Sequence, residues 1–429
     1  MKNSVQALLS CFPIAELYKS RSQTNLFECF DSEYRTFSSE IKGCALRAYN
    51  KTQTEGKMYI KHGTLSIDDY FVNTIENTIP YMLLPQKKIK AVTNYAFDRK
   101  HKISQQEILS LYSDIQAALK GRKLKLHGLS IENHLTEYSL SNSYGVQGDG
   151  ITSFFNVHAI IRNPFGDFIE YAKKYIGETL TTVLDEITGI PIERDAEKVF
   201  TGSIGGSEPV LLTSVAVGEL LYTFLLFMCD SMFVQSANYI KNNLDYILSQ
   251  PLISPLITIE ENSPFNQIVE GLVDGEGNER VPTLIVSKGR INTLLAGMNG
   301  IDRFPSTGSA FRFNYTMLPS IKATKIYMYP GIRRIDDYMK SCDTIAVINS
   351  IQGLHEGFNR ETFDFSGILN ARIYKYGTFV GRITIPIKSN LIGILKSICI
   401  VFDKCEYTGD GSILAPSVGC YLSNLGVQG

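Results

Sequence analysis

Several absences narrow the classes of protein to which this 429-residue chain can belong. The 42 basic and 43 acidic residues nearly cancel, and no basic run is longer than the short segment 120–125, so a nucleic-acid partner is disfavoured. The most apolar stretch, Leu220–Cys229, has ten residues, whereas a membrane-spanning helix needs about twenty. We therefore expect neither a nucleic acid nor a membrane as partner, and we read this stretch as a buried helix.

Features of secreted proteins are also scarce. The eight cysteines are scattered without a CxxC pair or a dense framework, which is typical of reduced thiols in the cytoplasm. Tryptophan is absent from the chain. The first eleven residues carry one positive charge and too short an apolar core for a convincing signal peptide. We expect a cytoplasmic protein.

Catalytic motifs are missing as well. No GxSxG elbow occurs, and the glycine-rich segment 202–206 is not followed by Gly-Lys-Ser/Thr, so a serine hydrolase and a phosphate-binding loop are both disfavoured. Histidine is rare: there are six, at 62, 101, 127, 134, 158 and 355, and none between 159 and 354.

Ordinary proportions of 44% hydrophobic and 20% charged residues predict a folded globular chain, and the length suggests about two domains. Ser104, with Glu107 three residues later, predicts the start of an amphipathic helix whose apolar residues continue to Leu119. We expect a second helix over 168–187. Strands are predicted over 26–36, 43–50, 56–60, 135–141 and 152–162. The first domain, residues 1–195, is thus predicted to be an α+β unit with a sandwich of helices on a sheet.

Glycine and proline concentrate in 191–209, which places the domain boundary between 192 and 208. Beyond it we expect a helix over 216–234, a hairpin turning at Lys288-Gly289, and another turning within 375–378, followed by a helix from Ser389. The second domain, residues 196–429, is predicted to be mainly antiparallel β, barrel-like, with few helices.

Short motifs in a fixed order give the chain a family resemblance. Those near the C-terminus are Gln352–Asn359, Phe363–Ser366, Gly381–Ile385 and Gly411–Ser417, and weaker ones precede them at 143–146, 255–261, 274–277, 306–308 and 329–331. In this order and spacing the chain resembles the TldD/PmbA family, which pairs a zinc-peptidase subunit with a metal-free sister. The resemblance covers most of the chain but is weak in the N-terminal part.

The resemblance also indicates which sister this is. The zinc subunit of the family has an HExxxH helix and a cysteine ligand near the C-terminus, a donor set suited to zinc. The metal helix is expected between residues 159 and 354, where this chain has no histidine. The chain therefore resembles the PmbA (TldE) sister, and we expect neither a metal site nor a catalytic residue of its own.

Three local patterns were weighed against this interpretation. His355-Glu356 has no second histidine four or five residues later, and its flanking glycines favour a turn. Cys405 lies near the position of the family's cysteine ligand, but without histidine partners a buried thiol is the favoured reading. Asp274–Asn278 resembles a calcium loop, yet Glu279 replaces the required glycine, so a turn between strands is preferred.

The resemblance implies a PmbA/TldE-like, non-catalytic subunit of a heterodimeric zinc metallopeptidase that matures leader peptides or degrades unfolded polypeptides. Zinc is then expected in a TldD-like partner, and this chain is expected to be inactive alone. Residues Gly353, His355, Gly357 and Asn359 are the candidates for lining the peptide cleft. An extended peptide bound by strand addition would place little demand on its sequence.

Two other readings stay open at this point. One is a stand-alone homodimer that binds peptides or regulates another protein without proteolysis, a class that includes the family's older label, modulator of DNA gyrase. The other is an active peptidase with unusual ligands, which metal analysis of the purified protein would test.

Overall fold

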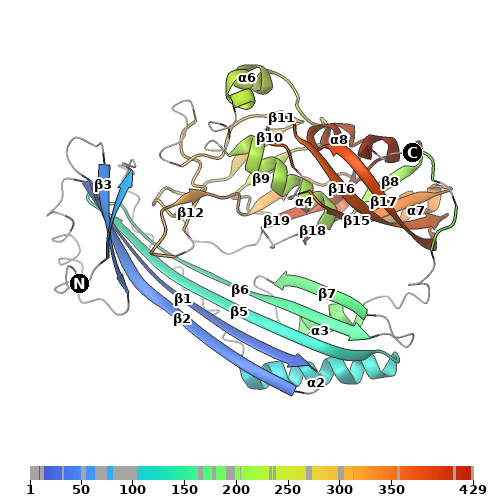
Figure 1. The fold of residues 1–429 in the computed structure, drawn as a ribbon, viewed down its shortest axis with the longest axis horizontal. Coiled ribbons are helices and arrows are strands. Elements are labelled where there is room, and N and C mark those ends of the chain that lie inside the picture. Colours follow the sequence, from blue (N-terminus) through green and yellow to red (C-terminus); the bar gives the residue numbers. More distant parts are fainter. Residues whose placement is uncertain are drawn as a thin grey trace.

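A computed structural model gives the fold (Figure 1). It describes residues 9, 14–30, 33–49, 55–62, 75–80, 104–162, 168–175, 180–189, 199–202, 204–230, 234, 238–266, 273–297, 304–312, 314–354, 358–408 and 412–426.

The N-terminal half forms a seven-stranded antiparallel sheet with the order β4-β3-β2-β1-β5-β6-β7. Its strands are β1 (Ile14–Phe30), β2 (Glu33–Tyr49), β3 (Glu55–His62), β4 (Ile75–Pro80), β5 (Lys125–Asn142), β6 (Gln147–Arg162) and β7 (Phe168–Tyr175). The four central strands are 16 to 18 residues long, well beyond the usual five or six. They arch beneath the C-terminal half of the molecule (Figure 1).

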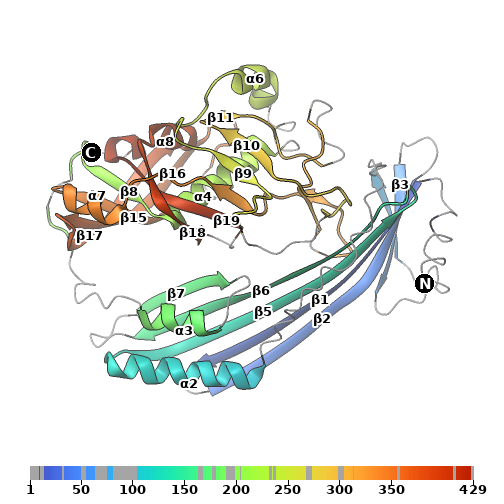
Figure 2. The same cartoon turned by 180° about the vertical axis from the view of Figure 1, so that it is seen from behind.

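Two helices, α2 (Gln105–Gly121) and α3 (Leu180–Gly189), pack on one end of this sheet (Figure 2). The predicted capping box is confirmed: the Ser104 side chain accepts a hydrogen bond from the Glu107 amide, and the Glu107 carboxylate accepts one from the Ser104 amide. The apolar face from Ile108 to Leu119 is buried against the sheet, as its spacing predicts.

The predicted helix over 168–187 is wrong in its first half. Residues 168–175 form strand β7, paired with β6 from Ile161 opposite Ile169 to Phe155 opposite Tyr175, and the helix begins only at Leu180. Tyr171 and Tyr175 are spaced four apart, which suits a helix face and equally one face of a strand. The predicted single strand over 26–36 is also wrong, because β1 ends at Phe30 and β2 begins at Glu33.

The C-terminal half contains a ten-stranded mixed sheet. The order is β11-β10-β9-β14-β19-β8-β15-β16-β17, with β18 beside β19, and β8/β15 and β14/β19 are its parallel pairs. Its strands are β8 (Pro209–Leu212), β9 (Ile259–Glu261), β10 (Thr283–Ser287), β11 (Arg290–Ile291), β14 (Ile326–Met328), β15 (Ile345–Gln352), β16 (Asp364–Lys375), β17 (Thr378–Asn390), β18 (Ile400–Thr408) and β19 (Ile413–Tyr421). The α+β class and the mainly antiparallel pairing are confirmed. The predicted barrel-like shape is not a closed barrel among the described strands: they form an open sheet whose outer strands are β11 and β17.

Helices cover both faces of the second sheet. Helix α4 (Ser214–Phe224), the π-helical turn η1 (Leu225–Cys229) and α8 (Leu391–Ser397) share the main core with it, whereas α7 (Ile335–Ser341) covers a smaller cluster around Phe402. The remaining elements are α6 (Asn238–Ser249), the 3-10 turn η2 (Leu422–Leu425), and the small pair β12 (Ala310–Phe311) and β13 (Ser320–Ile321). In the part of the chain that the structure describes, no helix is both long and apolar enough to cross a membrane.

Both predicted hairpins are present. Lys288 and Gly289 have φ angles of 47° and 76° at the β10–β11 turn, and Tyr376 and Gly377 have 47° and 77° at the β16–β17 turn. Positive φ at both central residues matches the twist of antiparallel strands. The predicted boundary near residue 195 falls within 190–198, outside the described residues, and stays a prediction.

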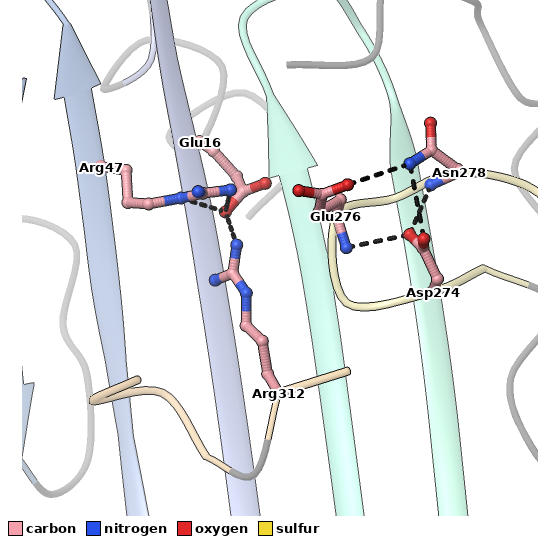
Figure 3. A network of polar contacts seen from close by, with 6 residues as sticks. All are labelled: Glu16, Arg47, Asp274, Glu276, Asn278 and Arg312. Carbon is pink, nitrogen blue, oxygen red and sulfur yellow. Dashed lines mark hydrogen bonds and ion pairs between the residues drawn. The ribbon is translucent and has the colours of Figure 1, made fainter. Parts of the chain in front are cut away.

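A buried charged cluster joins the first sheet to the C-terminal half of the chain (Figure 3). The Glu16 carboxylate on β1 accepts a hydrogen bond from Arg47 Nε on β2 at 3.0 Å and another from Arg312, which follows β12. All three side chains are at most 1% exposed. The Arg312 guanidinium also lies 4.4 Å from the Tyr18 ring centroid.

Neighbouring contacts extend this junction. The Tyr315 amide donates to Ser20 Oγ at 3.0 Å, and the Tyr138 hydroxyl donates to the Val273 carbonyl at 3.0 Å. Beside the cluster, the buried Asp274 accepts hydrogen bonds from the Glu276 and Asn278 amides (Figure 3), so the predicted turn at 274–278 is present. The long sheet is thus fixed to the C-terminal half by charge pairing and main-chain contacts.

Replacing Arg312 by alanine is expected to lower the free energy of unfolding by about 3–5 kcal/mol, because the buried Glu16 then keeps only one of its two arginine partners. Urea denaturation followed by circular dichroism measures this. Arg21→Ala is the matched control, since it removes an exposed ion pair to Glu40 and should change stability little. Equal losses in the two variants would contradict the assigned role of the cluster.

Acid should weaken the same junction. Burial alone would raise the pKa of Glu16, but Arg312 and Arg47 together hold it below the ordinary value of 4.5. A lowered carboxyl pKa stabilises the fold above that ordinary value, and the stabilisation is lost as the pH falls through the folded-state pKa. The stability difference between the wild type and Glu16→Gln should therefore shrink when unfolding is measured from pH 7 down to pH 3. A difference that stays constant would rule this out.

Candidate functional site

Helix α4 lies where the resemblance places the metal helix. It starts at Ser214, two residues before the predicted start, and continues into the π turn Leu225–Cys229. Asp230 is already extended, so the predicted continuation to 234 is wrong at this point. The helix buries apolar residues on several sides, because it lies inside the main core rather than on a surface.

Gly218 on α4 is a point of close approach to strand β18. A Cβ atom built on Gly218 would lie 2.0 Å from Thr408 Oγ1 and 2.4 Å from Thr408 Cβ. Real Cβ atoms do not approach neighbours so closely, and Thr408 is itself buried. Any side chain larger than hydrogen at position 218 must displace this strand or the helix.

Glu219 is the next residue, and it faces strand β15. Its Oε2 accepts a hydrogen bond from the Ile351 amide at 2.9 Å. Burial raises the pKa of this carboxyl, and the Ile351 hydrogen bond partly offsets that effect. Glu219 is the only charged residue in the apolar segment 209–229.

Thr223 lies one turn further along α4. Its hydroxyl donates to the Glu219 carbonyl at 3.0 Å, which is a common way for a buried threonine to satisfy its hydroxyl within a helix. Both Thr223 and Gly218 are buried.

Cys405 is a protonated thiol in a half-buried position on β18. Its Sγ donates to the Met328 carbonyl at 3.6 Å, and burial raises its pKa to about 11. Cys405 is half-buried rather than fully buried, so the prediction of a buried thiol is met only in part.

Of the four candidate cleft residues, the structure describes Gly353 and Asn359, whereas His355 and Gly357 lie outside the described residues. Gly353 has a φ of 90°, and a Cβ there would meet the Ser366 carbonyl at 2.7 Å. The Asn359 side chain accepts hydrogen bonds from the Glu361 and Thr362 amides and so closes a turn before β16. These two roles shape the backbone, and substrate contact by the four residues stays a prediction.

The described histidines lie away from α4. His62 is on β3, His127 and His134 are on β5, and His158 is on β6, so all four belong to the first sheet. Among the described residues, no group of three or more histidine, cysteine, aspartate or glutamate side chains is arranged to hold a metal ion.

Comparison with known proteins now decides the family. The model of the PmbA/TldA metallopeptidase C-terminal domain matches residues 205–429, which contain the second sheet and α4. The chain belongs to the PmbA/TldD family. The metalloprotease TldD homolog of Buchnera aphidicola subsp. Acyrthosiphon pisum is 26% identical over 217 residues, which are 48% of this chain and 42% of that protein. The match therefore spans less than half of that relative's length.

Solved structures agree on the fold over nearly the whole length. TldE from Thermococcus kodakarensis has a TM-score of 0.77 at 15% identity and covers 99% of this chain and 100% of its own. A protein from Thermotoga maritima, described as a modulator of a DNA gyrase, also scores 0.77, at 16% identity with 98% of each chain covered. A similarly described Bacteroides thetaiotaomicron protein scores 0.69 at 14% identity, covering 99% of this chain and 98% of its own. The N-terminal sheet, which the sequence matches only weakly, thus belongs to the same fold.

The PmbA/TldD motif reveals residues that sequence reasoning missed. Gly218–Thr223 has the spacing of HExxxH, with glutamate kept in second place and glycine and threonine where the two histidines stand. The signal was available as a lone glutamate in an apolar helix. A motif defined by its histidines does not include it.

The residues present at this place do not fit zinc. The contact of Gly218 with Thr408 leaves no room for a side chain, the Thr223 hydroxyl is engaged within the helix, and the Cys405 thiol donates to the Met328 carbonyl. Of the three motif positions, only the glutamate is present, and the Glu219 carboxylate accepts a hydrogen bond from the Ile351 amide.

A Gly218→Ala substitution should destabilise the chain by about 1–3 kcal/mol, the usual cost of overpacking. In an unhindered helix the same change would raise the free energy of unfolding by up to about 1 kcal/mol. A decrease would therefore indicate the close contact between position 218 and Thr408. Thr408→Gly removes the opposing atoms, and Gly218→Ala should then cost less in a double-mutant cycle of urea unfolding. Additive effects of the two changes would argue against the close packing.

Proposed function

We propose that this chain is a PmbA/TldE-like, non-catalytic subunit of a two-subunit zinc metallopeptidase. In this proposal, zinc and the catalytic residues belong to a TldD-like partner, and this chain helps to hold the peptide substrate in a heterodimer. The observation that carries the proposal is the α4 helix, where Gly218 and Thr223 occupy the histidine positions of HExxxH and the first position is sterically closed.

The preserved architecture supports a subunit role. The family fold is present over nearly the whole chain, which matches TldE of Thermococcus kodakarensis over 99% of its length. The buried Glu16–Arg312 junction keeps the long sheet in a fixed relation to the C-terminal half. A chain that only shapes a substrate site depends on such fixed geometry and needs no titratable nucleophile or metal ligand of its own.

A peptide is the substrate class favoured by the relatives. One relative is named a metalloprotease and another TldE, and leader-peptide maturation or degradation of unfolded polypeptides is the activity that we propose for the heterodimer. We also propose a cytoplasmic location, which the cysteines support: the seven that the structure describes are free thiols.

Reconstitution tests the proposal directly. The purified chain should contain no stoichiometric zinc by plasma mass spectrometry and should not cleave fluorescein-labelled β-casein. A TldD-like chain of the same organism should form a heterodimer with it, observed by light scattering during gel filtration, and the mixture should cleave casein until 1,10-phenanthroline is added.

Two controls separate the alternatives. The partner alone reports its own activity, and a Gly218→Ala variant reports whether the fold around α4 is needed. Zinc bound one-to-one by this chain alone, or chelator-sensitive cleavage by it alone, would overturn the proposal. A homodimer that ignores every TldD-like chain would instead favour a stand-alone binding protein.

A further inference from the structure

Strand β15 contains a bulge next to helix α4. Its pairing with β16 runs from Ile345 opposite Tyr374 to Ile348 opposite Ala371 and resumes with Ile351 opposite Leu369, so β15 has one residue more than its partner. A bulge bends its strand and removes a main-chain group from the regular ladder. Here the Ile351 amide donates to Glu219 Oε2 at 2.9 Å.

The glutamate therefore does two things at once. It satisfies the amide of Ile351, the buried residue at which the ladder with β16 resumes after the bulge, and it fixes the direction in which β15 leaves the sheet towards Gly353, whose φ is 90°. An unsatisfied buried amide would cost more than an ordinary hydrogen bond contributes. The contact joins residues 132 positions apart, so local sequence alone does not impose it.

A second contact on the same helix holds the returning chain. The Phe227 ring, in the π turn, stacks on Phe358 with ring centroids 4.8 Å apart, and the Arg360 guanidinium lies 5.4 Å from the Phe227 ring centroid. A π turn rotates fewer degrees per residue than an α turn. Phe227 is thereby brought back towards the face of the helix that carries Glu219.

The residues exposed beside these contacts suit a peptide main chain. Asn349 in the bulge and Gln352 at the end of β15 are exposed. An amide side chain both donates and accepts hydrogen bonds, which matches the N–H and C=O groups of an extended peptide whatever its sequence.

We propose that Glu219 is a positioning residue: with Phe227 it holds the segments Ile351–Leu354 and Phe358–Phe363 in place, and so sets the site at which an extended peptide main chain binds. The peptide part of this inference rests on the proposed function. Helix α4 thus supports the substrate site.

Two measurements on the full-length chain test the inference. Hydrogen exchange followed by mass spectrometry reports the order of Ile351–Leu354 and Phe358–Phe363, and fluorescence anisotropy of labelled β-casein reports peptide binding. In Glu219→Ala, exchange in these segments should be about tenfold faster, the factor that corresponds to losing one hydrogen bond to an acidic group. The Kd for casein should rise as the held conformation loses population.

Conservative and matched variants show that the effect comes from the hydrogen bond. Glu219→Gln keeps an acceptor for the Ile351 amide and should restore both measurements. Val215→Ala changes an exposed residue of the same helix and should leave both unchanged. Gln352→Ala should weaken casein binding without faster exchange, which keeps the inference testable if Glu219→Ala fails to fold.

The outcomes separate this inference from the proposed function. Unchanged exchange in Glu219→Ala overturns the positioning role, and faster exchange with unchanged casein affinity overturns the link to the peptide site. If the wild-type chain and its heterodimer both fail to bind casein, the proposed function fails, whereas the exchange measurement still decides whether Glu219 positions these segments.

Discussion

The buried pairing of Glu16 with Arg47 and Arg312 is the contact on which the arrangement of the molecule depends. It brings one carboxylate and two guanidinium groups into a region at most 1% exposed, where an unpaired charge is costly. Because Glu16 and Arg47 come from the first sheet and Arg312 from the C-terminal half, the pairing is satisfied only when both parts are folded and docked. Charge pairing therefore specifies one relative position, whereas apolar contacts alone would tolerate several.

Within that frame, helix α4 is a structural element of the main core. At Gly218, strand β18 approaches until Thr408 fills the space that a side chain would need. A histidine at this position would require the core to open. The neighbouring Glu219 accepts a hydrogen bond from the Ile351 amide.

The sequence predicted those parts of the fold whose causes are local. The capping box at Ser104, the positive-φ turns at Lys288-Gly289 and Tyr376-Gly377, and the absence of metal-helix histidines are each readable within a few residues. Residues 168–175 are a strand because they pair with β6, a long-range contact that local spacing does not reveal: Tyr171 and Tyr175, four apart, fit a helix and a strand alike. Glu16 and Arg312 are 296 residues apart, and nothing near either one indicates the other.

The candidate site shows the same division between local and long-range causes. Gly353 was singled out from its sequence, and its φ of 90° against the Ser366 carbonyl explains why glycine stands there. Glu219 was not, because its role exists only where the packing of α4 brings its carboxylate to the Ile351 amide, at the point where the β15–β16 ladder resumes after the bulge. A register shift of one residue between two strands is invisible in either strand alone. The function of that glutamate therefore follows from the packing of α4 on the sheet, and a search restricted to catalytic motifs would pass over it in any chain that has lost the histidines.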